Sequence, residues 1–152
     1  MMFSRLMPLA LLPLLMSCAA DGSPPASKPV AGTGAIAKAL DGTRWNVTEI
    51  GGKSPARGTI EFKEGRIFGS GGCNRYTGGV KATASGGFAA GAFESGQVAM
   101  TMMACPESVM ENEQAFMEAL ATADRWAIVA DDRLELSSGK KLLLKASRIK
   151  AD

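Results

Sequence analysis

Two short segments, each with one cysteine in a tightly constrained setting, limit how this chain can fold. The first is residues 69–78, Gly-Ser-Gly-Gly-Cys-Asn-Arg-Tyr-Thr-Gly, and the second is residues 101–106, Thr-Met-Met-Ala-Cys-Pro. The four glycines of the first segment indicate a backbone that bends sharply or lies close to another segment. Pro106 suits the first turn of a helix, where its missing N–H leaves no bond unmade. We therefore predict that the two segments meet in space and hold together a small domain rich in β-structure.

Residues 1–17 have the pattern of a secretory signal peptide. Arg5 is followed by an apolar run over residues 6–16, which is shorter than the about 20 apolar residues that a membrane-spanning helix needs. The run ends in Leu-Met-Ser-Cys at Cys18, which resembles the lipobox of bacterial lipoproteins, where the cysteine becomes the first mature residue and carries lipid with acyl chains such as palmitate. An ordinary cleaved signal with an incidental cysteine is the alternative. In such lipoproteins an Asp after the cysteine favours the inner membrane, so Ala19 points to the outer membrane, with the protein facing the periplasm.

The rest of the chain divides into a tether and one domain. Residues 18–37 are rich in Ala, Gly, Ser and Pro and contain no aromatic residue, which is typical of a flexible linker. Residues 38–150 have the length of a domain with a single core.

Composition narrows the function classes. The chain has no His, which removes the commonest metal ligand and the commonest general base. Its 17 Lys and Arg residues nearly balance 15 Asp and Glu residues, whereas nucleic-acid binding requires a clustered basic face. We therefore predict no nucleic-acid partner and no metal or cofactor.

Alternation of apolar and polar residues predicts seven to nine short antiparallel strands. A turn at Glu64-Gly65 joins two of them into a hairpin, and Leu142-Leu143-Leu144 suggests burial on both faces. We expect an α+β domain: a curled antiparallel sheet, or partial barrel, with one helix packed against it and covering an open side. The predicted strands are residues 43–50, 59–63, 66–70, 79–84, 88–93, 97–101, 125–130, 133–137 and 141–145.

A single helix is predicted over residues 107–123. Ser108, with a glutamate three residues later, is spaced as a capping box, and apolar residues at helical spacing form a stripe that Glu113 interrupts. The opposite side is acidic, which suits either a solvated face or a basic partner. Its residues are Glu107, Glu111 and Glu118.

These features together resemble a known family. Trp45, the segment Gly71-Gly72-Cys73-Asn74-Arg75-Tyr76, and Thr101-Met102-Met103-Ala104-Cys105-Pro106 followed by Met110, Glu113, Phe116 and Leu120 are similar to the META domain. That domain occurs in the heat-shock protein HslJ and in many bacterial envelope lipoproteins. The resemblance implies a small curled antiparallel sheet with a helix against it, an envelope location and a stress-linked role. It implies no catalytic site, and the family fold has been compared with a type III secretion pilotin.

The cysteines of the domain are interpreted as a pair. Exported chains meet an oxidising compartment, which favours a structural disulfide between Cys73 and Cys105. Free buried thiols and a redox function are the alternatives, although the two residues are too far apart for a C-x-x-C motif. The glycine-rich run lacks the Gly-Lys-Ser/Thr ending of a phosphate-binding loop.

Two groups of residues are candidates for binding. Asn74, Arg75 and Tyr76 form either a small recognition patch or the polar end of a strand. Met102 and Met103 belong to a methionine-rich segment, and such soft side chains suit adaptable apolar binding, core filling or copper(I) ligation.

We therefore expect a non-catalytic, stress-related envelope lipoprotein, held to the membrane by its lipid, that binds an apolar ligand or protein segment. A structural or assembly factor of the pilotin type, acting on a secretion or outer-membrane machine, is the alternative. Serines are numerous, but no Gly-x-Ser-x-Gly elbow and no His is present to activate one.

Lipid attachment at Cys18 gives the first testable prediction. Protein extracted from membranes should have the mass of a chain that begins at Cys18 and carries diacylglycerol and one further acyl group. A Cys18→Ala variant should lose that added mass. Wild-type protein that is soluble and unmodified would contradict the prediction of a lipid anchor.

Overall fold

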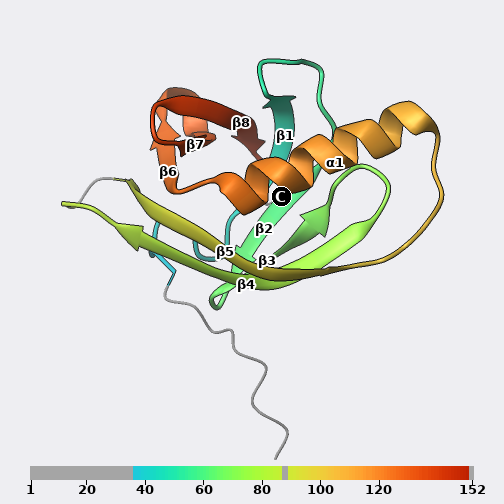
Figure 1. Ribbon diagram of the computed structural model, residues 1–152. Helices are drawn as coiled ribbons and strands as arrows, with labels where there is room; N and C mark the ends of the chain where they lie inside the picture. The colour runs from blue at the N-terminus through green and yellow to red at the C-terminus, as the bar shows by residue number, and fades with distance from the viewer. Residues whose placement is uncertain (1–35, 87–88, 151–152) are drawn as a thin grey trace, which may run out of the picture.

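The strands pair in chain order and the first also pairs with the last, which closes an antiparallel barrel (Figure 1). The computed structural model describes residues 36–86 and 89–150. One helix, α1 (Glu107–Thr122), lies between the fifth and sixth strands. The strands are β1 (Arg44–Ile50), β2 (Thr59–Lys63), β3 (Arg66–Ser70), β4 (Arg75–Ala84), β5 (Ala90–Met100), β6 (Arg125–Val129), β7 (Arg133–Ser138) and β8 (Lys141–Arg148), with the short 3-10 helix η1 (Ala130–Asp132) between β6 and β7.

The barrel interior is filled by alternate residues of the strands, as the predicted alternation requires. Val47 of β1 lies opposite Ala146 of β8, which in turn lies opposite Leu134 of β7. All three are at most 1% exposed. Of the three leucines predicted to be buried on both faces, only Leu144 is buried, because β8 has β1 and β7 beside it but only one face toward the core.

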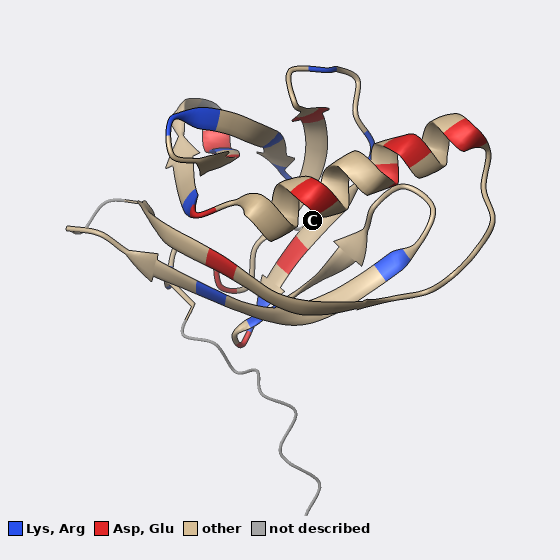
Figure 2. Cartoon of the chain, viewed as in Figure 1, with Lys and Arg blue, Asp and Glu red and all other residues tan. Residues whose placement is uncertain are grey.

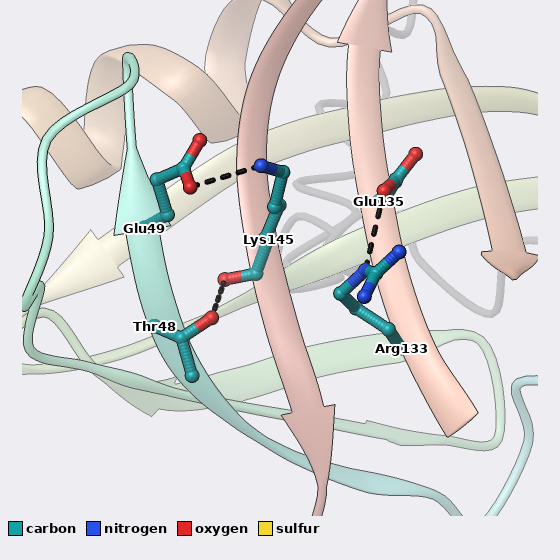
Figure 3. A network of polar contacts seen from close by, with 5 residues as sticks. All are labelled: Thr48, Glu49, Arg133, Glu135 and Lys145. Carbon is teal, nitrogen blue, oxygen red and sulfur yellow. Dashed lines mark hydrogen bonds and ion pairs between the residues drawn. The ribbon is translucent and has the colours of Figure 1, made fainter. Parts of the chain in front are cut away.

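The outer face of the closing strands carries charged side chains instead (Figure 3). Lys145 Nζ lies 2.9 Å from Glu49 Oε2, and the Thr48 hydroxyl donates to the Lys145 carbonyl at 3.2 Å. Arg133 and Glu135 form a second ion pair at 3.3 Å. Pairs that are partly open to water contribute only about 0–1 kcal/mol each. The closure of the barrel therefore depends mainly on the strand ladder and the core.

The turn predicted at Glu64-Gly65 is present. Both residues have positive φ, 50° and 73°, which is the geometry of the two-residue turns that match the twist of a hairpin. The β2–β3 pairing then runs without a shift from Lys63 opposite Arg66 to Thr59 opposite Ser70. The local sequence pattern therefore predicted this hairpin correctly.

The next hairpin is longer than predicted. β4 begins at Arg75, inside the glycine-rich run, and β5 is one strand of 11 residues where two short strands were expected. The β4–β5 pairing is irregular between Gly78 and Val80 and continues on both sides of this point. Glycines and alanines hid the alternation in this region, because they contribute little to an apolar pattern.

The helix covers the barrel where β5 leaves β6. Only Ala90–Ala92 of β5 pair with β6, and α1 crosses in front of the strands at this side (Figure 1). The buried face of the helix consists of Glu113, Phe116, Ala119 and Leu120. The predicted α+β class, with a curled antiparallel sheet and one packed helix, is confirmed, and the strand order closes into a barrel.

The predicted capping box is wrong. The helix begins at Glu107 with Pro106 as its N-cap, and no side chain caps it. The Pro106 carbonyl accepts hydrogen bonds from the N–H groups of Val109 and Met110, so Ser108 lies within the first turn. A proline before the helix replaced the expected serine because its fixed φ already suits the helix start.

The predicted signal peptide, Cys18 and nearly all of the tether lie outside the described residues. Ile36 and Ala37, which the tether was expected to include, pair with Ala82 of β4. Among residues 36–86 and 89–150, no helix is both long enough and apolar enough to cross a membrane.

Removing a side chain that joins α1 to the barrel tests this packing. Leu120 is fully buried, so Leu120→Ala should lower the free energy of unfolding by about 2–5 kcal/mol. Met110→Ala on the same helix is the matched control, because Met110 is 39% exposed and its truncation should change stability by about 0.5 kcal/mol or less. Urea denaturation of both variants measures the difference, and equal losses would contradict the described burial.

Candidate functional site

A buried carboxyl group on the helix holds the first cysteine segment. Glu113 is only 2% exposed. Its Oε2 accepts hydrogen bonds from the backbone N–H groups of Cys73 and Asn74, and its Oε1 accepts one from the Asn74 side-chain amide at 2.7 Å. A buried acceptor with several donors is well satisfied. Glu113 therefore fixes the β3–β4 loop to α1.

Asn74 extends the same network to the segment that follows β5. Its Oδ1 accepts a hydrogen bond from the Thr101 hydroxyl at 2.9 Å and one from the Met103 N–H at 2.7 Å. Asn74 is 2% exposed. One amide side chain therefore connects the helix, the loop and the residues before the helix.

A second asparagine and a glycine complete the junction. The Asn112 side-chain amide donates to the carbonyls of Arg57 and Gly71, at 2.7 Å and 2.9 Å. A Cβ atom on Gly71 would lie 2.8 Å from Glu113 Cγ, closer than real Cβ contacts. Only glycine fits here, as the expected close approach of two segments requires.

The two cysteines are joined beside this network. The Cys73 and Cys105 sulfur atoms lie 2.03 Å apart and the Cα atoms 6.0 Å apart, within the range of a disulfide. The residues are 32 positions apart in sequence, and a loop of that length corresponds to about 3–4 kcal/mol of stabilisation in the chain-entropy model.

Two of the predicted recognition residues belong to the fold. Tyr76 is 3% exposed, its hydroxyl donates to the Thr59 carbonyl at 3.0 Å, and its ring lies 5.4 Å from that of Phe116. Burial raises the pKa of the Tyr76 hydroxyl above its usual value. Asn74 and Tyr76 are therefore largely buried within the fold, which favours the alternative of a strand end over a recognition patch, whereas Arg75 is exposed. Strand alternation turns Tyr76 inward and Arg75 outward, whereas Asn74 precedes β4 and is held inward by hydrogen bonds with Glu113 and Met103.

The methionines predicted to bind lie on the surface. The large hydrophobic residues that are exposed in the described part of the chain are all methionines, and they flank the junction of β5 and α1. Met102 is 97% exposed and Met103 is 57% exposed. We call this group the methionine surface: Met100, Met102, Met103 and Met110.

Together with Met117, two of these methionines, Met100 and Met110, line a groove beside the helix. Its volume is about 790 Å³, and Met100 of β5 faces Met110 and Met117 of α1 across it. That volume lies within the range of ligand-binding pockets, about 300–1,000 Å³. Glutamates of α1 line it as well: Glu107, Glu111, Glu113 and Glu118.

Two carboxylates of the barrel strands face cations: Glu61 of β2 lies 4.0 Å from Arg44, and Glu94 of β5 lies 3.5 Å from Lys81. Within residues 36–86 and 89–150, no group of three His, Cys, Asp or Glu side chains is arranged to hold a metal ion. The methionine surface is the candidate binding site, because the exposed large apolar side chains of the described residues gather there.

Replacing Glu113 tests the junction. In Glu113→Gln one oxygen becomes an NH₂ group, and in either orientation it faces a donor: the two backbone N–H groups or the Asn74 amide. We expect a loss of about 1–3 kcal/mol in the free energy of unfolding, because buried donors lose their partner. Glu111→Gln, exposed on the same helix, should change it by about 0.5 kcal/mol or less. Denaturant unfolding with the disulfide intact measures both, and equal stabilities would contradict the assigned role.

Comparisons with known proteins place the fold. An NMR structure of a protein from Burkholderia xenovorans is 22% identical, with a TM-score of 0.58 and a match that covers 85% of this chain and 99% of that one. A second NMR structure is 26% identical, with a TM-score of 0.52 and coverage of 71% and 90%. The crystal structure of a DUF4847 family protein from Bacteroides vulgatus is 18% identical, with a TM-score of 0.50 and coverage of 74% and 96%.

No curated protein matches this chain. The model of one family, the META domain, does match, over residues 38–149. This range contains both cysteine segments, the helix and all eight strands. The resemblance seen in the cysteine segments is therefore confirmed, and the chain belongs to the META domain family.

Proposed function

We propose that this protein is a non-catalytic lipoprotein of the bacterial envelope that binds an apolar ligand or a protein segment through its methionine surface. The observation that carries the proposal is the exposure of Met100, Met102, Met103 and Met110 at one junction. Exposed apolar groups gathered in one place mark interaction sites in many proteins.

The backbone under this surface is held in place, which favours binding. The Met103 N–H donates to Asn74 Oδ1 at 2.7 Å, and the Thr101 N–H donates to the Arg75 carbonyl at 3.0 Å. The disulfide at Cys105 restrains the same segment. Flexible side chains on a restrained backbone can repack around a partner while little backbone entropy is lost.

The absence of catalysis is proposed from the chemistry of the chain. It has no His, and the disulfide removes two thiols from use as nucleophiles. The buried Glu113 already accepts three N–H hydrogen bonds from the β3–β4 loop. Its oxygens lie within a structural junction and away from open solvent.

The proposed location follows from the leader. A lipid on Cys18 and a tether to residue 37 would hold the domain near the outer membrane, on its periplasmic side. An oxidising periplasm suits the Cys73–Cys105 disulfide. We also propose a stress-related role, because the META domain occurs in the heat-shock protein HslJ.

A function as an assembly factor would use the edge of β5, which ends at Met100 of the methionine surface. Beyond Ala92, no strand pairs with the outer edge of β5 among the described residues. Such an edge can accept a strand from another protein. This observation favours a protein segment over a small ligand.

Photo-crosslinking in the envelope tests the proposal. A photoreactive amino acid replaces Met102 in the full chain, and Ser85, exposed in the β4–β5 hairpin at the other end of β5, is the control position. We expect a specific adduct from position 102 and not from position 85, with mass spectrometry identifying it as lipid or protein. The same adducts from both positions, or none from position 102, would overturn the proposal.

A further inference from the structure

The groove beside α1 combines an apolar floor with an acidic rim. Met100, Met110 and Met117 supply the apolar side chains, and the groove has a volume of about 790 Å³. Glu107, Glu111 and Glu118 line the same groove and are exposed. We call this the methionine groove.

No ion pair within the described residues neutralises the rim glutamates, although Lys53 and Lys141 line a neighbouring pocket with Glu118, and Lys53 lines another with Glu111. The helix has no Lys or Arg residue, and Figure 2 shows acidic residues along it without a basic one. In the described part of the chain, none of the ion pairs includes Glu107, Glu111 or Glu118. These carboxylates remain available to cations from outside the chain.

We propose that the occupant of the methionine groove is a basic amphipathic segment of a partner protein. Its apolar side chains contact the methionines, and its Lys or Arg side chains pair with the three glutamates of the rim. The inference rests on the proposed binding function and adds the chemical class of the partner.

Charge decides among the possible occupants. A basic segment gains attraction at three carboxylates, whereas an anionic lipid headgroup or an acidic peptide meets repulsion there. A neutral apolar ligand would use the floor and leave the rim without a role. A groove lined by methionines and acidic residues can accept varied basic sequences, because the thioether side chains adapt in shape.

Three synthetic peptides with the same leucine pattern test the proposal. Their polar positions carry Lys, Glu or Ser, and binding to the disulfide-bonded protein is followed by fluorescence anisotropy and by the NMR signals of ¹³C-labelled methionine methyl groups. We expect the Lys peptide to bind most tightly, to shift the signals of Met100, Met110 and Met117, and to weaken as ionic strength rises.

Two triple variants distinguish the effect of the rim glutamates on binding from the effect of the protein's net charge. The triple variant Glu107→Gln, Glu111→Gln, Glu118→Gln should weaken the Lys peptide about tenfold, because three exposed ion pairs are lost. The control triple variant Glu61→Gln, Glu64→Gln, Glu94→Gln has the same change in net charge, and none of these residues lines the groove. It should leave the affinity within about twofold.

Each outcome decides the inference. Equal binding of the Lys, Ser and Glu peptides with methionine shifts would overturn the basic partner but leave the proposed binding function in place. No methionine shift with the Lys peptide, equal effects of the two triple variants, or a self-associated dimer that occupies the groove would also overturn it. Photo-crosslinking from position 102 tests the proposed binding function separately.

Discussion

The carboxyl group of Glu113 is the constraint on which the arrangement of this domain depends. It lies on the buried face of α1 and accepts hydrogen bonds from the loop between β3 and β4. A buried acceptor of this kind is costly unless every lone pair finds a donor. The loop must therefore stay against the helix, and Gly71 must stay a glycine to allow the approach.

Asn74 transmits that constraint to the surface. Its amide donates to Glu113 while its carbonyl oxygen accepts from Thr101 and Met103. The chain between β5 and α1 consequently has a fixed path, and the side chains of Met102 and Met103 point outward. The disulfide between Cys73 and Cys105 links the same two segments covalently, so the base of the methionine surface is held by two independent means.

The barrel supplies the second determinant of the surface. β5 pairs with β6 over only Ala90–Ala92 and then continues alongside β4 to Met100. This departure leaves room for α1 and places its methionines beside the end of β5. The interior is filled by aromatic and branched side chains such as Trp45 and Trp126, which are at most 1% exposed. A packed core of this kind leaves the outer grooves as the places where the domain can bind.

The local elements could be predicted from the sequence alone. The alternation and the Glu64-Gly65 turn predicted the β2–β3 hairpin, and the helical spacing predicted the start of α1 at residue 107. These features depend on neighbouring residues, so a short window contains the information. Other features became clear from the tertiary structure. The sheet closes between β1 and β8, and β5 is one long strand. Asn74 and Tyr76 face inward. The structure also explains why Glu113 interrupts an apolar stripe, because the N–H groups that donate hydrogen bonds to it lie about forty residues away in the chain. Pairing between distant segments depends on register and on hydrogen bonds to groups elsewhere in the chain, and no local pattern of residues records either.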